Sequence, residues 1–392
     1  MKEVVIVSAC RTPIGSFGGT LSSISAPKLG ALVIEESIKR ANISKESVNE
    51  VIMGNVVQAG VGQAPARQAA IYAGLPTSVE TFTVNKVCGS GLKAIMLASQ
   101  SIALGDADVI VAGGMESMSN APYLVPQARY GYRYGNAELQ DSLMRDGLQD
   151  IYTGVPMGNF AEQCAKECSV PREAQDEFAI LSYKRAQESV TTGRFKDEIV
   201  KVLIAGKKGV TTFVDTDEEP FKTNFDKIPT LRPAFQKEGT VTAANSSKIN
   251  DGAAALVLMS AEKAKELGLK PIARIIASGS AAKDPSWFTT APADVITKVL
   301  KKAGLTVGDI DLFEINEAFA VVALAVTKIA GIDVNKVNVN GGAVALGHPI
   351  GASGARITVS LLHALKQRGL KRGMAAICIG GGEASGLILE LV

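Results

Sequence analysis

Histidine, cysteine and tryptophan are all scarce in this chain of 392 residues, which contains two histidines, five cysteines and one tryptophan. Both histidines lie far in sequence from Cys164 and Cys168, the most closely spaced cysteines, so a zinc site is not expected there. An odd number of cysteines at wide spacings also argues against a disulfide framework. Cys10, Cys164 and Cys168 are therefore interpreted as packing residues, and a reducing, cytoplasmic location is expected.

Neither sign of charge is in marked excess, because 41 Lys and Arg residues face 39 Asp and Glu residues. This balance gives no reason to expect a nucleic-acid partner. The short apolar run at the N-terminus is typical of a strand rather than of a secretory signal. The longest apolar stretch, residues 318–330, contains Thr327 and Lys328 and is too short to span a membrane. The length favours two or more packed units of an ordinary globular protein, with no membrane partner.

The sequence NKVCGSG at residues 85–91 places Cys88 just before a helix-like run, residues 92–104. Unpaired backbone N–H groups at a helix N-terminus favour an anion, and such positions can lower a thiol pKa from about 8.5 to roughly 3.5–7.5. The motif therefore indicates a thiolate nucleophile. The alternative interpretation, a small buried hydrophobe at a tight turn, is equally compatible with this motif alone.

Several landmarks recur in the same order about 260–270 positions apart, which indicates an internal duplication. The paired segments are residues 4–8 and 274–278, 51–55 and 312–316, 90–91 and 353–354, and 109–116 and 376–383. Each copy alternates apolar, strand-like runs with helical stretches, which predicts α/β halves with mixed or parallel sheets covered by helices. Between the copies lies a segment rich in Tyr, Gln, Asp and Lys, with a predicted surface helix over residues 171–191. An insertion this long is typical of a lid or a binding element.

The second copy carries its own candidates for chemistry. His348 lies between glycines at a helix mouth, where a histidine is poorly placed as core filler, and the duplication sets it near the counterpart of the Cys88 loop. Cys378 ends a strand-like run before Gly380, where it is either a structural cysteine or a proton carrier, and the glycines expose N–H groups for an oxyanion. Asn316 either caps a helix or holds a water or substrate carbonyl. His363 is interpreted as a solvated surface histidine.

Together these segments resemble the four catalytic blocks of the thiolase family, and the resemblance runs through essentially the whole chain. The blocks are residues 85–91, 316–319, 347–351 and 378–382, with RTPIG at 11–15 also fitting. The resemblance implies a duplicated α-β-α-β-α layered fold with an inserted loop domain. Its expected divisions are an N-terminal half (1–117 and 250–270), the loop domain (118–249) and a C-terminal half (271–392). It also implies a homotetramer, arranged as a dimer of dimers.

The resemblance implies a reversible Claisen condensation of two acetyl-CoA molecules to acetoacetyl-CoA and CoA, with no cofactor required. Cys88 carries the acyl group, and His348 activates Cys88 and stabilises the thioester oxygen together with a water held by Asn316. Cys378 exchanges the proton at the α-carbon, and the N–H groups of Cys88 and Gly380 form an oxyanion hole. Substrate and CoA contacts are expected, by position, at Leu148, Met157, Tyr183, Lys222, Thr223, Asn224, Lys227, Phe235, Ser247, Phe288, Ala318 and Phe319. Of these, Lys222 and Lys227 have an independent rationale as cations for CoA phosphates.

Two segments, residues 240–246 and 287–292, are most similar to the potassium-responsive, mitochondrial-type acetoacetyl-CoA thiolases within this family. That similarity implies a K⁺ ion held by Tyr183, Ala243, Ala244, Ser246 and Val344. Phe288 hints at tolerance for a 2-methyl substituent. Pro156 departs from the biosynthetic pattern, which usually has His before Met157, and is more similar to degradative enzymes that act on longer chains.

Three alternatives remain. A degradative 3-ketoacyl-CoA thiolase with broader chain length would keep the same reaction. A β-ketoacyl synthase on the same fold is disfavoured by Cys378, and a non-catalytic CoA- or lipid-binding relative by the presence of all four candidate catalytic side chains. A nucleotide-dependent dehydrogenase is weaker still, because the strand–GxGxxG–helix pattern is missing from the sequence.

Overall fold

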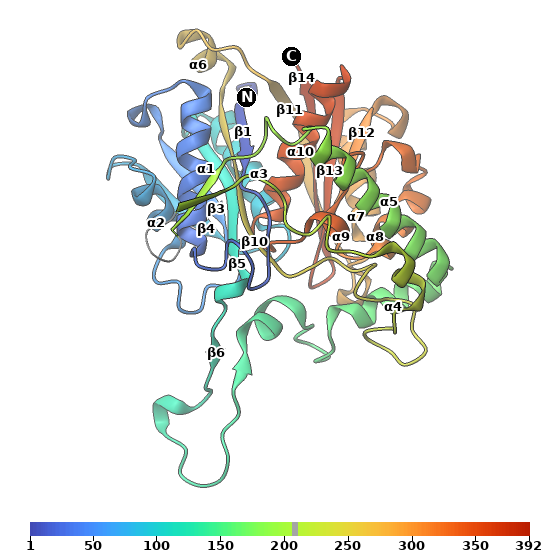
Figure 1. Cartoon of the computed structure of the whole chain (residues 1–392). Helices are drawn as coiled ribbons and strands as arrows, with labels where there is room; N and C mark the ends of the chain where they lie inside the picture. The colour runs from blue at the N-terminus through green and yellow to red at the C-terminus, as the bar shows by residue number, and fades with distance from the viewer. Residues whose placement is uncertain (206–210) are drawn as a thin grey trace.

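The computed structural model describes residues 1–205 and 211–392. Figure 1 shows a layered α/β body from which one long arm, drawn in cyan-green around β6, projects away. The main sheet runs in the order β12-β13-β14-β11-β1-β10-β5-β3-β4, and the two-residue strand β2 pairs with β10.

The strands divide into two sets of the same design. The first set comprises β1 (Val4–Arg11), β2 (Gly15–Ser16), β3 (Glu50–Gly54), β4 (Glu80–Val84), β5 (Val109–Ser117) and β10 (Asn250–Ser260). The second comprises β11 (Ala273–Ala282), β12 (Leu312–Ile315), β13 (Arg372–Ile379) and β14 (Glu383–Leu391). Parallel pairs join β3 to β4 and β5 and join β12 to β13, whereas the other neighbours are antiparallel, so the sheet is mixed.

The two sets meet where β1 pairs with β11, through Val5 opposite Arg274 and Ile6 opposite Ala273. Outward from this junction the order is β10, β5, β3 on one side and β14, β13, β12 on the other. The outermost β3–β4 pairing also has an echo, because Phe313 of β12 forms a parallel bridge with Val337. The duplication predicted from the sequence is therefore confirmed in the strand order.

Helices form the remaining layers of the body. The helices α3 (Ser90–Leu104) and α10 (Ser353–Arg368) pack on each other at the centre, and their apolar side chains share one core with strands of both sets. The outer helices α1 (Ala26–Ala41) and α2 (Pro65–Tyr72) cover the first set of strands. On the opposite side, α7 (Ala291–Ala303) and α8 (Ala320–Ala330) cover the second set. This arrangement confirms the predicted α-β-α-β-α layering.

Burial from two sides accounts for the apolar character of α3. With the residues before it, Val87–Leu104 is long and apolar enough to cross a membrane by length and composition. In the fold, however, Leu92, Ile95 and Ile102 are fully buried in the central core, so α3 is apolar because it is an internal layer.

The central helices cross very closely at their N-terminal ends, and glycines make this approach possible. A Cβ atom at Gly354 would lie 2.4 Å from the backbone nitrogen of Leu92, and one at Gly91 would lie 2.8 Å from the nitrogen of Ala355. The repeated Ser-Gly pair of the sequence thus marks the point where the N-terminal ends of α3 and α10, here called their mouths, contact each other.

Within the segment predicted as an insertion, the described residues 118–205 and 211–249 form the arm and a cover over one end of the body. The strands β6 (Tyr123–Leu124) and β7 (Gln140–Asp141) pair at the base of the arm, and β8 (Val202–Ala205) pairs with β9 (Thr211–Val214). The helices are α4 (Met157–Glu167) and α5 (Arg172–Thr191), and α5 packs on α8 and on α9 (Ala343–Leu346). The helix predicted over residues 171–191 is confirmed, with Pro171 as its N-cap residue rather than in its first turn.

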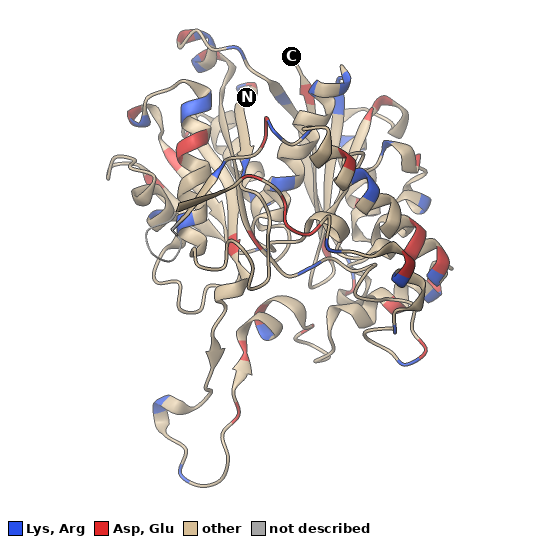
Figure 2. Ribbon diagram, viewed as in Figure 1, with Lys and Arg blue, Asp and Glu red and all other residues tan. Residues whose placement is uncertain are grey.

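The remaining elements are short. They are α6 (Ala261–Glu266), a π-helical turn (Met144–Leu148) and the 3₁₀ turns Lys45–Ser47, Met118–Asn120, Ala128–Tyr130, Phe225–Thr230, Pro285–Trp287, Val307–Asp309 and Val334–Lys336. In the ribbon of Figure 2, the positions of Lys and Arg and those of Asp and Glu are interspersed along the outer helices rather than separated, as the balanced composition predicts.

The sequence-based interpretation of His363 as a solvated surface residue is wrong. His363 lies on α10 and is half-buried, with Nε2 3.4 Å from the carbonyl oxygen of Ala9. Burial lowers the pKa of this imidazole. The periodicity of α10 suggested an exposed face, but β1 partly covers the helix at this position.

Candidate active site

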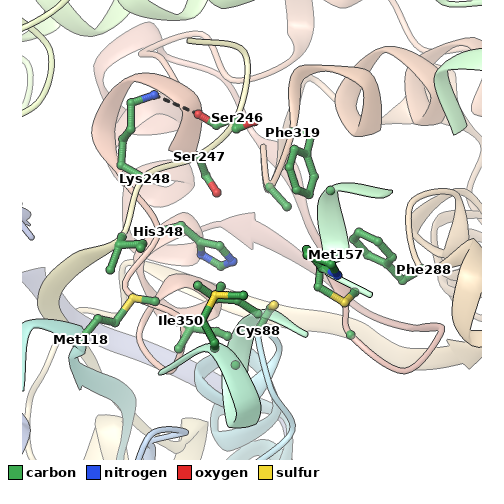
Figure 3. A pocket seen from close by; sticks show the side chains of 18 of the residues that line it. Cys88, Met118, Met157, Ser246, Ser247, Lys248, Phe288, Phe319, His348 and Ile350 are labelled. Carbon is green, nitrogen blue, oxygen red and sulfur yellow. Dashed lines mark hydrogen bonds between the residues drawn. The ribbon is translucent and has the colours of Figure 1, made fainter. Parts of the chain in front are cut away.

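A cavity of about 300 Å³ opens at the paired mouths of α3 and α10, under the inserted segment. Figure 3 shows its lining side chains. The residues that line it come from both halves and from the insertion: Cys88, Met118, Met144, Gly147, Leu148, Pro156, Met157, Gly158, Phe235, Ser246, Ser247, Lys248, Ile249, Phe288, Ala318, Phe319, His348, Ile350 and Gly380. Thus the structure brings together two of the sequence-predicted catalytic side chains, Cys88 and His348, in one wall.

The turn that presents Cys88 is strained and tightly bonded. Val87 has φ of +45°, a conformation that is costly for a β-branched residue and that marks functional turns. Ser90, the first residue of α3, holds the turn: its Oγ accepts a hydrogen bond from the N–H of Lys86 (2.8 Å) and donates one to the carbonyl of Val87 (2.6 Å). Gly89 is required for the close fit, because a Cβ there would lie 2.4 Å from Ile379.

The position of Cys88 before a helix suggested a lowered pKa, but burial acts on this thiol in the opposite direction. Desolvation by the surrounding apolar wall raises the pKa of this thiol to about 11, which outweighs the opposing effect of two N–H groups, those of Gly380 and of Cys88 itself. The helix N-terminus alone therefore does not supply a thiolate. A base has to remove the proton.

His348 is built to be that base. Ser353 Oγ lies 2.5 Å from His348 Nδ1 and donates its own hydrogen to the carbonyl of Pro349 (2.9 Å). Because the hydroxyl hydrogen is already committed to Pro349, Ser353 has to accept the Nδ1–H of the imidazole. Nε2 then carries the lone pair. It is buried and has no hydrogen-bond partner among the described residues.

The surroundings also keep this imidazole neutral. Burial, reinforced by the charge of Arg356, lowers the pKa of His348 to about 3. The backbone that carries the imidazole is also held, since the backbone N–H of His348 donates to Asn250 Oδ1 (3.0 Å), and Gly347 provides a φ of +109° that lets the chain pass Asn250. Figure 3 shows the imidazole on the cavity side, in the same wall as Cys88.

The other two predicted catalytic side chains lie beside the cavity rather than in its lining. Cys378 is fully buried at the end of β13, where burial and then the neighbouring Cys88 raise its thiol pKa well above the usual range. The N–H of Ala318, a lining residue, points at its sulfur. Asn316 follows β12 and is 1% exposed, yet both polar atoms of its side-chain amide lack a hydrogen-bond partner among the described residues. Such an orphaned buried amide fits a bound water or substrate oxygen better than a helix cap.

Two backbone donors converge near the Cys88 sulfur, namely the N–H groups of Gly380 and Cys88. Gly380 follows β13 and lines the cavity, and a Cβ there would make only ordinary contacts with Val87 and Met157. Two fixed N–H donors beside a nucleophile are the geometry that stabilises a developing oxyanion. The arrangement agrees with the oxyanion hole expected from the sequence.

Met157 and Phe319, the two residues predicted for the acyl pocket, both line the cavity. Four further predicted substrate contacts also line it, namely Leu148, Phe235, Phe288 and Ala318. Phe235 and Phe319 pack edge to face with ring centroids 6.0 Å apart. Gly158 allows this, because a Cβ there would lie 2.3 Å from the Phe235 ring. The pocket is therefore apolar and narrow, and Pro156 also contributes to it.

A second, more open hollow adjoins the cavity and shares Phe235, Ser246, Ser247, Lys248 and Ile249 with it. Of the predicted CoA contacts, Ser247 and Lys222 line this hollow. Thr223, Asn224 and Lys227 follow Lys222 along the chain, and both Asn224 and Lys227 are exposed, whereas Thr223 is half-buried. Lys222 already pairs with Glu218 (2.8 Å), and the Asn224 side chain caps the following 3₁₀ turn.

Tyr183 does not fit the predicted CoA contact. It lies on α5, its side chain is fully buried in a cluster that also contains Val344, and the ammonium of Lys248 lies over its ring. A side chain covered in this way does not reach a molecule lying in the outer hollow. The resemblance located Tyr183 in the sequence but could not show that its side chain is fully buried.

Tyr183 does join the group expected to hold K⁺. The structure brings Tyr183 and Val344 into one cluster, and it places Lys248 against Tyr183 and against the carbonyl oxygens of Ala243 and Ser246. Tyr183 Oη is buried and has no hydrogen-bond partner in the part of the chain that the structure describes, as an ion ligand would be. Two of the expected carbonyl ligands are, however, taken by the Lys248 ammonium.

Sequence reasoning missed several lining residues: Met118, Met144, Gly147, Gly158, Lys248, Ile249 and Ile350. Met118 directly follows the strand β5, and Ile350 lies within the block of residues 347–351, so both positions gave a weak signal. The others are placed by the path of the insertion. Lys248 was within two residues of the expected cation ligands, but a backbone-carbonyl site carries no side-chain signature.

Comparison with known proteins accounts for this architecture. The N-terminal domain of thiolases matches residues 4–262, and the C-terminal domain of thiolases matches residues 269–391. An acetyl-CoA acetyltransferase of Schizosaccharomyces pombe is 56% identical over 391 residues, covering 100% of this chain and 99% of that protein. The mitochondrial acetyl-CoA acetyltransferase of Rattus norvegicus is 55% identical, covering 100% and 91%.

A solved structure agrees with these relatives. The crystal structure of the Bacillus anthracis acetyl-CoA acetyltransferase matches with a TM-score of 0.98 at 44% identity, covering 100% of this chain and 99% of that one. The chain therefore belongs to the thiolase family.

Proposed function

We propose that this chain is an acetyl-CoA acetyltransferase that catalyses the reversible condensation of two acetyl-CoA molecules to acetoacetyl-CoA and CoA. The observation that carries the proposal is the pairing of Cys88 with a neutral imidazole whose unprotonated Nε2 is buried at the same cavity. The relatives that match the whole chain bear this name.

The first half-reaction follows from the protonation states at the site. His348 Nε2 takes the Cys88 proton, and the thiolate attacks the acetyl-CoA carbonyl, forming the acyl–sulfur bond as the bond to the CoA sulfur breaks. The thiol of Cys378, whose pKa is raised well above its usual range, holds a proton at rest and can give it to the departing CoA sulfur. The N–H groups of Cys88 and Gly380 lie where they can stabilise the carbonyl oxygen.

The second half-reaction resets each group. The Cys378 thiolate removes a proton from the α-carbon of a second acetyl-CoA, and the resulting carbanion attacks the acyl carbonyl on Cys88. The bond to Cys88 breaks, and its thiolate recovers the proton from His348. Asn316, with its unpartnered amide, is the group positioned to hold a water or the thioester oxygen during this step.

The test is CoA-dependent loss of acetoacetyl-CoA absorbance, compared with longer 3-oxoacyl-CoA substrates. We expect the four-carbon substrate to react fastest, because Phe235, Phe319 and Phe288 close the far wall of the cavity. Cys88→Ser is expected to lose the acyl-enzyme and turnover, whereas unchanged turnover would refute the nucleophile. A preference for longer chains would favour the degradative alternative suggested by Pro156, which lines the same cavity.

We also propose a homotetramer. The arm carries large apolar side chains that a monomer leaves in water: Tyr134 is fully exposed, and Tyr123, Tyr130 and Leu139 are mostly exposed. An exposed apolar segment on a projecting arm fits contact with further copies of the chain. Light scattering after size exclusion checks this, and a monomeric mass would contradict it.

The cytoplasmic location and the division into residues 1–117 with 250–270, 118–249, and 271–392 stay predictions. Cell fractionation checks the location, and limited proteolysis checks whether cleavage gathers at the boundaries of the insertion. A role for K⁺ and tolerance for 2-methyl substrates at Phe288 also stay predictions. Rate measurements in K⁺ against Na⁺, and with 2-methylacetoacetyl-CoA, test them.

A further inference from the structure

The segment of residues 243–249 separates the two hollows and touches both. Ser246, Ser247, Lys248 and Ile249 line the inner cavity and the outer hollow alike. The segment is only half-buried at Ser247, Lys248 and Ile249, and it has no helix or strand to hold its shape. Something else has to fix it in place.

Backbone bonds to Ala318 and Phe319 hold one side of the segment, and Lys248 adds to this fixation by folding back on its own segment. Its Nζ donates to the carbonyl oxygen of Ala243 (2.6 Å) and to that of Ser246 (3.0 Å), and it lies 5.8 Å from the ring centroid of Tyr183. Figure 3 shows this side chain curling over the segment, with the bond to Ser246 drawn as a dashed line. Carbonyl oxygens and an aromatic face are the ligands that a compact cation takes in a protein.

The same groups were expected to hold K⁺, and the structure disagrees with that expectation at two of them. An ion that used the carbonyls of Ala243 and Ser246 would have to lie where the Lys248 ammonium lies. These carbonyl oxygens and the Tyr183 ring do surround a cation in this chain, and Tyr183 Oη is buried with no hydrogen-bond partner among the described residues. The carbonyl oxygens of Ala243 and Ser246 and the Tyr183 ring therefore form a cation-binding site, here called the seat, and the cation that occupies it is the Lys248 ammonium.

We propose that the Lys248 ammonium is the resident cation of this seat, so that Lys248 positions the CoA-facing segment and makes the enzyme indifferent to K⁺. Lys248 acts as a positioning residue, because it touches the segment and not the reacting atoms.

The segment is tied directly to the catalytic groups, which explains how the seat can affect the reaction. The N–H of Ser247 donates to the carbonyl of Ala318 (2.9 Å), and the carbonyl of Lys248 accepts from the N–H of His348 (3.3 Å). Ser246 also bridges to Phe319 of the acyl pocket. A loosened segment would thus displace the outer hollow first and the His348 backbone second, raising KM more than it lowers kcat.

The experiment compares K⁺ with Na⁺ at equal ionic strength in the full-length protein. We expect wild-type KM for acetoacetyl-CoA and CoA, and wild-type Tm, to be the same in both salts. Lys248→Ala removes two charge-assisted bonds and opens the seat. In Na⁺ its KM should rise about tenfold, and K⁺ should bring KM back and raise Tm.

Lys248→Met is the matched control, because it removes the charge but still fills the space. It should show the raised KM without recovery in K⁺. Lys263→Ala, on α6 and paired with Glu266, removes a lysine elsewhere and should change neither KM nor its salt response.

A wild-type enzyme whose KM or Tm responds to K⁺ as Lys248→Ala does would overturn the proposal, and this arm needs no variant to fold. Unchanged KM in Lys248→Ala, or an alanine variant that K⁺ neither rescues nor stabilises, would overturn it as well. This inference rests on the proposed function only for the KM measurements, which need an active enzyme. An inactive wild type would sink the proposed function alone, since the Tm comparison still tests the seat.

Discussion

The N-terminal ends of α3 and α10, their mouths, are equivalent positions in the two halves of the duplicated fold, but they have different roles at the site. Each helix begins with a Ser-Gly pair and each follows a loop that carries a catalytic candidate, Cys88 in the first half and His348 in the second. The first serine, Ser90, bonds only backbone groups of its loop. Its counterpart, Ser353, bonds the imidazole. One hydroxyl shapes a turn and the other selects a tautomer.

The two mouths also differ in the protonation that their surroundings favour. Burial raises the pKa of Cys88 to about 11 and lowers that of His348 to about 3, so both groups are neutral near pH 7. Neither half alone creates a charged nucleophile. The duplicated fold brings the thiol and the imidazole together. Proton transfer from Cys88 to His348 becomes favourable only when the substrate and the oxyanion donors stabilise the charge that forms.

The largest expected effect tests the base. His348→Asn should slow acylation of Cys88 by about 10²–10⁴-fold near pH 7, because the thiol proton has no other acceptor. The defect should shrink as pH rises toward the Cys88 pKa of about 11, where water chemistry supplies the thiolate. Rapid-quench measurement of acyl-enzyme across pH checks this. A defect that stays constant up to pH 10 would show that His348 does something other than remove the proton.

The paired serines allow a matched comparison of the two mouths. Ser353→Ala leaves Nδ1–H without its acceptor and releases the tautomer, so acylation should fall about tenfold to a hundredfold. Ser90→Ala should instead lower stability by about 1 kcal/mol, through the lost loop bonds, with the imidazole unaffected. ¹⁵N NMR of His348 should change in the first variant only. The same imidazole shift in both variants would contradict the division of roles.

Much of this comparison was predictable from the sequence, because the deciding residues carry local signatures. Glycines around Cys88 and His348 announced two turns, and the repeated Ser-Gly pair announced equivalent helix mouths. The features that could not be predicted from the sequence depend on how deeply each side chain is buried. The rise in the Cys88 pKa comes from burial beside apolar groups remote in the chain, such as Val56 and Ile350. The burial of Tyr183 and the partial burial of His363 also come from neighbours remote in the chain.

Contacts made through the backbone were also beyond sequence reasoning. Lys248 meets carbonyl oxygens, which every residue possesses, so no pattern of side chains could show that its ammonium would occupy the seat expected for K⁺. Cys378 shows the opposite case. Its motif position was clear, and its place just behind the lining gives a physical reason for its raised pKa.

Alkylation of Cys88 measures the protonation difference directly. Because the thiol pKa is raised to about 11, the thiolate fraction at pH 7 is small and grows about tenfold per pH unit. The rate of iodoacetamide modification at Cys88, followed by peptide mass spectrometry, should therefore climb steadily from pH 7 to pH 10. Cys168, half-buried at the end of α4, serves as an internal reference. A plateau between pH 6 and pH 8 would reveal a resting thiolate–imidazolium pair instead.

A substitution at the contact between α3 and α10 is expected to have the smallest effect on activity but a clear effect on stability. In Gly354→Ala the new Cβ would lie 2.4 Å from the backbone nitrogen of Leu92, so the crossing helices have to move apart. Such overpacking costs about 1–3 kcal/mol of unfolding free energy. Gly308→Ala is the control, since its Cβ would meet only Thr306 Oγ1 at 3.6 Å. Thermal unfolding of both variants checks this, because equal Tm values would mean that the two halves tolerate separation at the mouths. If the mouths do separate, Cys88 and His348 move with their helices, and the loss of acylation rate should follow the loss of stability.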